Sequence, residues 1–289
     1  MKRRLILWIT TATLTAVLAS ASTAHAVPSW APVGQAAITP GVTTLTEGAE
    51  CTANFIYYDR SDKVYIGQAA HCSSTSPPEA IDGCQAESLP IGTKVLVAGA
   101  TRPGVMVYNS WITMQQKKET DENACAFNDL ALIQLDPADY GRVNPSVPHW
   151  GGPTGLSTGA RISERVFGYG NSPLRLRTGL LNAIEGMVLG QQGNGWSYRV
   201  HFLVPGVPGD SGSGFLDSQG RALGTLSTLG LFPETLSNGV SDLRRQLDYM
   251  RANSPYDVTV ANGTQPFRGA ISDLEKLLGG LLAGLLGGG

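Results

Sequence analysis

Pro208-Gly209-Asp210-Ser211-Gly212-Ser213-Gly214 sets a serine between two glycines and next to an aspartate. The glycines leave the Ser211 hydroxyl unobstructed and permit a backbone bend that points the Gly209 and Ser211 N–H groups at one spot. Paired N–H donors of this kind stabilise the oxyanion that develops during acyl transfer. Taken alone, the segment also fits an ordinary solvated Gly-Ser turn, and it is not a G-x-S-x-G elbow because position 213 is serine.

His71 is the best candidate for a proton shuttle at neutral pH. It stands in Gly67-Gln68-Ala69-Ala70-His71-Cys72, where small neighbours let another group approach its ring. His149 lies in a proline-rich and glycine-rich connection, which favours a surface position. His201 lies within a run of β-forming residues, which favours a packed or edge position.

Asp129 is the third residue whose position suggests chemistry. It begins the otherwise apolar run Leu130-Ala131-Leu132-Ile133. A carboxylate is costly at such a position unless it has a hydrogen-bonding partner. A strand-end cap is the simpler alternative.

The composition favours a turn-rich β protein. It argues against a chain that is disordered because of high charge and against a highly charged helical bundle. Only 15% of the residues are charged and 36 of 289 are glycine, against averages of about 25% and ~7%. The length predicts roughly two domains at ~150 residues each. The net charge of −2 makes the surface mildly acidic, whereas binding to nucleic-acid phosphates requires an excess of cations, so we expect no nucleic-acid partner.

The first 26 residues predict a secretory signal peptide. Lys2-Arg3-Arg4 precede an apolar run from Leu5 to about Leu18, and small residues then lead to Ala24-His25-Ala26. The run is shorter than the ~20 residues of a membrane-spanning helix, which argues against a permanent anchor. We therefore expect cleavage near Ala26 and a secreted, extracellular mature chain.

Four cysteines in an oxidising compartment predict two disulfides. They are Cys51, Cys72, Cys84 and Cys125, and their spacing leaves three pairings open. A zinc site is the alternative because His71 adjoins Cys72, but no C-x-x-C or H-x-x-x-H spacing supports it. We expect no metal and no cofactor.

The distribution of turn-forming residues predicts the domain boundaries. After the signal peptide, residues 27–50 form an irregular lead-in. Two β-rich domains then cover 51–150 and 151–252, divided by a connection rich in proline and glycine. The second domain ends in a helix that begins at Ser241-Asp242-Leu243. Residues 253–289 form a linker and a Leu/Gly-rich tail.

Within that tail, residues 272–286 carry a helical stripe of leucines behind a Ser-x-x-Glu capping box. This predicts a second short helix with an apolar face. It suits docking on a membrane surface, on a partner or on a second copy of the chain. Packing on the protein's own barrel and disorder are the alternatives.

Taken together, A-A-H-C at His71, N-D-L-A-L-I at Asp129 and G-D-S-G at Ser211 resemble the trypsin/chymotrypsin superfamily of serine proteases, in its secreted bacterial (streptogrisin-like) type. The resemblance covers roughly 43–250. It includes Gly168-Tyr169-Gly170, which is similar to a G-W-G turn of the family, and the helix at 241–251.

The resemblance implies an all-β fold of two antiparallel β-barrels with a C-terminal helix and the site between the barrels. It implies that Ser211 is the nucleophile, that His71 is its general base and then acid, and that Asp129 orients His71. Gly209 and Ser211 would supply the oxyanion hole. It also implies a Cys51–Cys72 disulfide, which leaves Cys84 to pair with Cys125.

The sequence departs from the family pattern at the substrate pocket. Pro205 stands six residues before the nucleophile, where a carboxylate would select Arg or Lys. The pocket wall corresponds to Ser227-Thr228-Leu229, with Leu229 in place of a glycine. We therefore expect a serine endopeptidase that takes protein or peptide substrates with small or medium apolar side chains at P1.

The alternative function is a binding or adhesion protein that keeps the fold but has a restricted pocket and little or no peptidase activity. A second departure concerns Asp210. No family-type Ile/Val-x-Gly-Gly amino-terminus is present to pair with it, and Arg161 and Arg165 are candidate partners.

Overall fold

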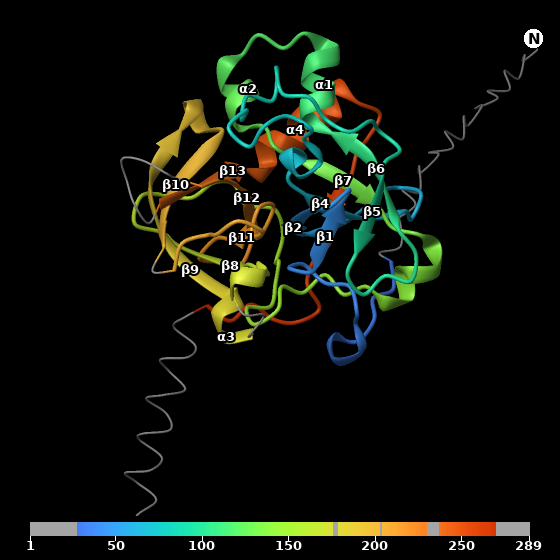
Figure 1. Ribbon diagram of the computed structural model, residues 1–289. Coiled ribbons are helices and arrows are strands. Elements are labelled where there is room, and N and C mark those ends of the chain that lie inside the picture. The colour runs from blue at the N-terminus through green and yellow to red at the C-terminus, as the bar shows by residue number, and fades with distance from the viewer. Residues whose placement is uncertain (1–27, 176–178, 203, 230–236, 270–289) are drawn as a thin grey trace, which may run out of the picture.

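Two antiparallel β-sheets, one in each half of the chain, form the body of the protein. In the computed structural model the described residues are 28–175, 179–202, 204–229 and 237–269. Figure 1 shows the sheets side by side, the first in blue and green and the second in yellow and orange. The prediction of an all-β fold of the two-barrel type with a C-terminal helix is confirmed, with the second barrel closed and the first an open half-barrel.

The first sheet has eight strands in the order β14-β3-β4-β7-β6-β5-β1-β2, so it is a half-barrel with β14 and β2 at its edges. Its strands are β1 (Thr43–Thr46), β2 (Ala49–Thr52), β3 (Ile56–Tyr58), β4 (Val64–Gln68), β5 (Lys94–Val97), β6 (Gly104–Asn109), β7 (Ala131–Gln134) and β14 (Thr259–Val260). The sheet begins before Cys51, because β1 lies within the segment 27–50 that was expected to be irregular.

The second sheet closes into a six-stranded barrel in the order β10-β13-β12-β11-β8-β9. Its strands are β8 (Arg165–Tyr169), β9 (Ala183–Gln192), β10 (Ser197–Phe202), β11 (Gly214–Leu216), β12 (Ala222–Leu229) and β13 (Ser237–Asp242). Side chains alternate between the two faces of a strand, so every second residue reaches the barrel interior. The interior is filled by Val166, Ile184, Val188, Val200, Phe202, Phe215 and Val240.

Helix α4 (Leu243–Asn253) is the predicted C-terminal helix. It begins at Asp242, whose side chain accepts the backbone N–H of Arg245 at 2.8 Å and so caps the first turn. Leu247 and Met250 are buried on one face, in a cluster that also contains Trp150 from the connection between the sheets. Burial of each large apolar side chain contributes roughly 1.5–3 kcal/mol.

Helices α1 (Ser110–Lys117) and α2 (Glu122–Phe127) lie side by side at one end of the molecule in Figure 1, where the sequence indicates no helix. Both are short, and both are capped by the side chain of the residue before them. Packing stabilises them, because Trp111 and Met114 are buried with Ala70, beside His71. The remaining helical segments are η1 (Val33–Gln35), η2 (Ala70–Ser73), η3 (Pro137–Arg142), η4 (Pro173–Arg175), α3 (Gly179–Asn182) and η5 (Gly193–Gly195).

Residues 254–269, expected to be a linker, form a C-terminal strap across the first sheet. β14 pairs with β3, and the backbone N–H of Ala261 donates to Ile56 at 2.9 Å. The strap then contacts the connection between the sheets, where Gly263 N–H donates to Pro153 at 2.8 Å and Arg268 N–H to Trp150 at 2.7 Å. These contacts tie the connection to the first sheet.

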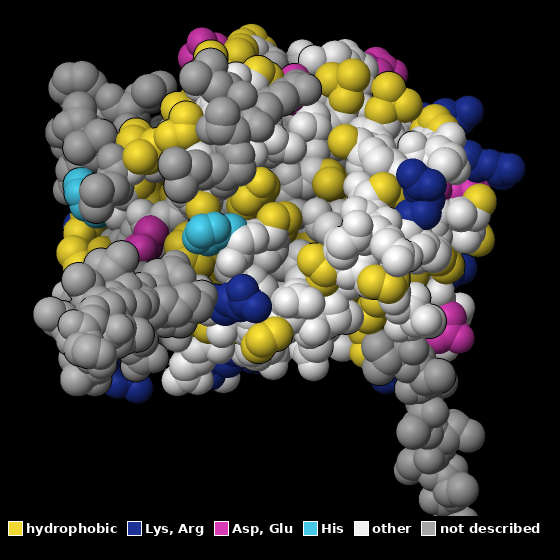
Figure 2. All heavy atoms as spheres, turned by 90° about the horizontal axis from the view of Figure 1, so that it is seen from below, with side chains coloured by type: hydrophobic (Ala, Val, Ile, Leu, Met, Phe, Trp, Pro, Cys, Tyr) yellow, Lys and Arg dark blue, Asp and Glu magenta, His cyan; other side chains and the backbone are white. Residues whose placement is uncertain are grey.

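The predicted signal peptide and the leucine-rich segment 272–286 lie outside the described residues. Within the described part of the chain, no helix has the length and apolarity needed to span a membrane. On the face in Figure 2, hydrophobic side chains form small separate groups with Lys and Arg side chains scattered between them.

Candidate active site

Strands β4 and β7 bring His71 and Asp129 together. The strands are antiparallel with Gln68 opposite Ala131, so the residues after β4 and before β7 lie at the same edge of the first sheet. His71 is in η2, which follows β4, and Asp129 lies two residues before β7. One Asp129 carboxylate oxygen accepts the backbone N–H of His71 at 2.9 Å, and the other lies 2.7 Å from His71 Nδ1.

A third group reaches Asp129 from the second barrel. Ser227 in β12 donates its hydroxyl to Asp129 Oδ2 at 2.6 Å. Burial alone would raise the pKa of Asp129, but the charge of His71 and the hydrogen bonds from His71 and Ser227 lower that pKa below its ordinary value. Asp129 is therefore an anion at neutral pH. Because a carboxylate only accepts hydrogen bonds, the shared proton sits on His71 Nδ1.

The His71 imidazole is 26% exposed, so one side of the ring is open to solvent. Burial would lower the pKa of His71, but the charge of Asp129 and the hydrogen bond to it outweigh burial and raise that pKa above its ordinary value. With its proton on Nδ1, a neutral His71 has a free lone pair on Nε2 and can act as a base.

The turn that contains Ser211 lies against the first sheet. Ser211 C=O accepts the N–H of Thr52, at the end of β2, at 2.9 Å. Gly212 has a φ of +87°, and a Cβ there would lie 2.7 Å from the backbone nitrogen of Ala69 and 2.6 Å from the carbonyl oxygen of Thr52. Glycine is therefore required at 212, and its close approach places Ser211 beside the segment that leads into His71.

The Ser211 hydroxyl makes no hydrogen bond to His71 among the described residues. The Ser211 turn lies against the residues that precede His71, through Gly212 and Ala69, but the structure shows no bond between the two side chains. Hydrogen bonds between catalytic groups are often long or misaligned without substrate and shorten in the reacting complex.

The backbone N–H groups of Gly209 and Ser211 have no protein acceptor within the described part of the chain. Their neighbours in the same turn are all engaged, since the N–H groups of Asp210, Gly212 and Ser213 donate to backbone carbonyls. Gly209 has a φ of +97°, a conformation that favours glycine. Two free donors with a single residue between them are the arrangement that an oxyanion hole requires.

Asp210 is fully buried and pairs with Arg175, which is 4% exposed. Arg175 Nη2 and Nε lie 2.7 and 2.8 Å from Asp210 Oδ2. The same guanidinium donates to the carbonyls of Leu181 at 2.8 Å and Pro205 at 3.0 Å. Neither candidate named from the sequence is the partner, because Arg165 pairs with Glu185 and the Arg161 side chain makes no ion pair among the described residues.

The expected pocket residues are only partly described. Pro205 is half-buried, and its carbonyl is bound to Arg175. Ser227 contacts Asp129. The backbone of β12 continues to Leu229, which pairs with Asn238, but the Leu229 side chain lies outside the described residues.

Three residues that contact the Ser211 turn were missed by sequence reasoning: Thr52, Ser172 and Arg175. Thr52 donates its hydroxyl to the Gly209 carbonyl at 2.8 Å, and Ser172 donates to the Pro208 carbonyl at 2.6 Å. Ser172-Pro173 is a recognisable start for a helical turn, with serine at the cap and proline at the first position. That signal predicts the helical turn η4, but it does not predict that Ser172 and Arg175 bind the Ser211 turn.

The prediction of two disulfides is confirmed. Cys51 joins Cys72 beside His71, and Cys84 joins Cys125 in α2. The sulfur atoms of the described chain that lie near His71 are therefore bonded to each other and are not free thiolates for a metal.

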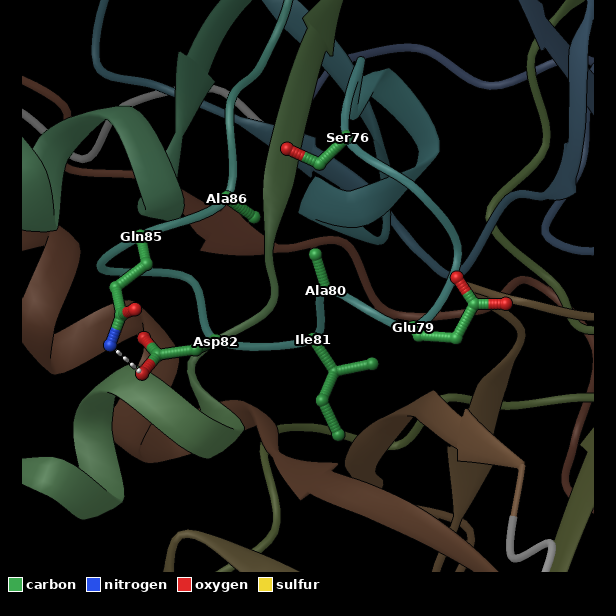
Figure 3. A pocket seen from close by; sticks show the side chains of 7 residues that line it. All are labelled: Ser76, Glu79, Ala80, Ile81, Asp82, Gln85 and Ala86. Atoms are coloured by element: carbon green, nitrogen blue, oxygen red, sulfur yellow. Dashed lines mark hydrogen bonds between the residues drawn. The ribbon is translucent and has the colours of Figure 1, made fainter.

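A surface hollow of about 380 Å³ lies in the loop after η2 and is lined by residues between Ser76 and Ala86 (Figure 3). Figure 3 shows Gln85 hydrogen-bonded to Asp82, which also accepts the backbone N–H of Cys84. A second hollow of about 650 Å³ lies over residues 158–164. Neither is lined by a predicted site residue.

No protein-family model and no curated protein matches the chain. Among solved structures, Thermobifida fusca Protease A superimposes with a TM-score of 0.51 at 16% identity, over 79% of this chain and 100% of that one. Nocardiopsis Protease gives 0.48 at 17%, covering 77% and 98%, and Cellulomonas bogoriensis chymotrypsin gives 0.47 at 15%, covering 78% and 98%.

The similarity to Protease A establishes that this chain has the two-barrel fold of the bacterial trypsin/chymotrypsin-like serine proteases. The resemblance noted in the sequence is therefore confirmed at the level of the fold.

Proposed function

We propose that the protein is a serine endopeptidase that hydrolyses peptide bonds through an acyl-enzyme. The observation that carries this proposal is the His71–Asp129–Ser227 hydrogen-bond chain, together with the neighbouring Ser211 turn, in which two N–H groups have no acceptor among the described residues. The trypsin-like fold supports it.

In this mechanism Ser211 Oγ attacks the scissile carbonyl while His71 Nε2 takes the hydroxyl proton. Asp129 holds the proton on Nδ1 and stabilises the imidazolium without accepting the proton itself. The negative charge that develops on the carbonyl oxygen is bound by the N–H groups of Gly209 and Ser211. His71 then protonates the leaving amine, and a water molecule activated by His71 hydrolyses the ester on Ser211.

The substrates would be proteins or peptides with small or medium apolar side chains at P1. No carboxylate stands at Pro205, so a cationic side chain would have no partner there. The cation that does reach Pro205, Arg175, is already paired with Asp210 and bound to two carbonyls, so it leaves no charge to attract an acidic side chain.

Export to an oxidising compartment is part of the proposal. Two disulfides that cross-link the region around His71 and α2 support it, since disulfides persist outside the reducing cytosol.

Labelling of the mature chain with a fluorophosphonate tests the chemistry, because only an activated serine reacts. We expect stoichiometric labelling that Ser211→Ala abolishes, and a peptide-library cleavage profile with apolar P1 residues. If the wild type neither labels nor cleaves, the proposal is wrong and the alternative of a binding protein is favoured. Labelling that persists in Ser211→Ala would assign the nucleophile elsewhere.

A further inference from the structure

Among the described residues, one side chain from outside the turn holds the peptide unit between Pro208 and Gly209. Ser172, fully buried, donates its hydroxyl to the Pro208 carbonyl at 2.6 Å. The N–H of the same peptide unit belongs to Gly209 and is one of the two free donors described above.

The two ends of this unit are coupled by covalent geometry. The unit is planar and trans, so its C=O and N–H point in opposite directions. A hydrogen bond that fixes the Pro208 carbonyl toward Ser172 therefore fixes the Gly209 N–H on the opposite side, away from Ser172. If the unit rotated, the carbonyl oxygen would replace the N–H and would repel an oxyanion.

The Ser172 hydroxyl is itself oriented. Its oxygen accepts the backbone N–H of Leu174 at 3.1 Å, which leaves its proton for Pro208. The Ser172 N–H donates to Asp210 Oδ1 at 3.1 Å, so the same residue contacts both sides of Gly209. The contact is close, because a Cβ built on Gly209 would lie 3.1 Å from Ser172 Oγ.

We infer that Ser172 is a positioning residue that sets the oxyanion hole by holding the Pro208–Gly209 peptide in one orientation. The inference rests on the proposed function and adds to it a residue outside the Ser211 turn. The next peptide unit has a separate anchor, the Thr52 hydroxyl on the Gly209 carbonyl, so Ser172 is the specific determinant of the Gly209 N–H.

The test is Ser172→Ala, compared with Ser157→Ala as a matched control. Ser157 is also buried and donates its hydroxyl at 2.7 Å, but to Asp217, which follows β11 and makes no contact with the Pro208–Gly209 peptide among the described residues. In Ser172→Ala we expect kcat to fall about 10- to 100-fold with KM little changed, because loss of an oxyanion donor acts on the transition state. Ser157→Ala should lower the melting temperature but leave kcat unchanged.

Inhibition by a peptide aldehyde gives a second readout. The aldehyde forms a hemiacetal with Ser211 whose oxygen occupies the hole, so its Ki should rise by the factor by which kcat/KM falls. Ser172→Thr, which keeps a hydroxyl, should restore most of kcat. Ser172→Cys keeps nearly the same side-chain volume but has a weaker hydrogen-bond donor, so its kcat should be lower than that of the wild type. This variant keeps the test available if Ser172→Ala does not fold.

The outcomes separate the two proposals. If the wild type and Ser211→Ala are equally inactive, the proposed function fails. If the wild type is active but Ser172→Ala or Ser172→Cys folds with unchanged kcat and unchanged aldehyde affinity, the role of Ser172 is wrong and the proposed function stands. A rise in KM alone would also contradict the positioning role, because it would place Ser172 in substrate binding.

Discussion

Asp129 and Asp210 are two buried carboxylates, one on each side of the site, and they differ in the cation that each one faces. Asp129 faces His71, an imidazole with a quarter of its surface exposed. Asp210 faces Arg175, a guanidinium that is almost completely buried. Both pairs have an N–O separation of 2.7 Å, so distance does not distinguish them.

The difference lies in what each cation does after pairing. A guanidinium keeps its proton at every working pH, and the donors of Arg175 are divided among Asp210 and two carbonyls. That pair has no remaining capacity for proton transfer and serves to hold the Ser211 turn. An imidazole gains and loses its proton near neutrality, and His71 keeps one ring nitrogen available. In the proposed mechanism, Asp129 therefore supports proton transfer by His71, whereas Asp210 holds the Ser211 turn in position.

The largest effect should come from Asp129→Asn, which keeps the shape of the first pair and removes its charge. We expect kcat to fall by about 10⁴-fold, as in triads of this type, because the amide favours the wrong tautomer of His71. Measurement of kcat and KM on a peptide amide checks this.

The same variant should change the pH profile. His71 must be neutral to act as a base, so activity rises with pH through its pKa. The raised pKa of His71 places this rise above the ordinary imidazole value of ~6.5 in the wild type. Asp129→Asn removes both interactions that raise the pKa of His71 and leaves the burial that lowers it. The rise in activity should therefore move to lower pH. A rise that stays in place or moves to higher pH would contradict the electrostatic role of Asp129.

Arg175→Met tests the second pair and should affect stability as much as activity. Removal of one partner from a buried ion pair costs about 3–5 kcal/mol, which urea unfolding would measure. The turn would lose its anchor, so we also expect kcat to fall by roughly 10²-fold or more.

The double variant Arg175→Met/Asp210→Asn provides the control. It removes the unpaired charge, so stability should partly recover while kcat stays low. If Arg175→Met alone loses stability but retains full kcat, the pair does not position the turn.

The sequence predicts the first pair because its residues lie in short motifs. His71 follows one β-strand and Asp129 precedes another, and each stands among small or apolar residues where a polar side chain is conspicuous. The second pair is not predictable in this way. In η4, Leu174 is 66% exposed while Arg175 is buried, the reverse of what residue type alone would suggest. Only the tertiary position of Asp210 makes a buried arginine favourable there.

The elements of the fold also divide into those that local sequence patterns predict and those that depend on tertiary contacts. The strands and α4 follow from local patterns of β-forming residues and of helix caps. α1, α2 and the C-terminal strap do not, because their stability comes from distant contacts such as Trp111 with Ala70 and Ala261 with Ile56. The sequence pattern was therefore sufficient for the barrels and for the motifs at their edges, but insufficient for the segments that hold them together.

A smaller effect should come from Gly170→Ala, which disturbs the second pair without removing a charge. A Cβ at Gly170 would overlap Asp210 Oδ1 and would lie 2.8 Å from Asp210 Cγ and 2.9 Å from Arg175 Nε. Overpacking of this kind costs typically ~1–3 kcal/mol, and we expect kcat to fall about tenfold. Gly190→Ala in β9 is the matched control, since nothing lies within 4 Å of its Cβ position. Equal kcat values for the two variants would mean that the pair tolerates displacement.

The smallest effect should come from Ser227→Ala, which removes one of three hydrogen bonds to Asp129. The two bonds from His71 remain, so the carboxylate stays paired and we expect kcat to fall only about three- to tenfold. This corresponds to ~0.7–1.4 kcal/mol, within the ~0.5–1.5 kcal/mol of a typical intramolecular hydrogen bond. The decrease in kcat should be similar for substrates with different P1 residues, because Ser227 acts through Asp129 in every case. Ser227→Thr, which keeps the hydroxyl, should retain most of the activity. If the alanine variant instead raises KM selectively for large P1 residues, Ser227 belongs to the pocket wall and the His71–Asp129 pair is supported from the first barrel alone.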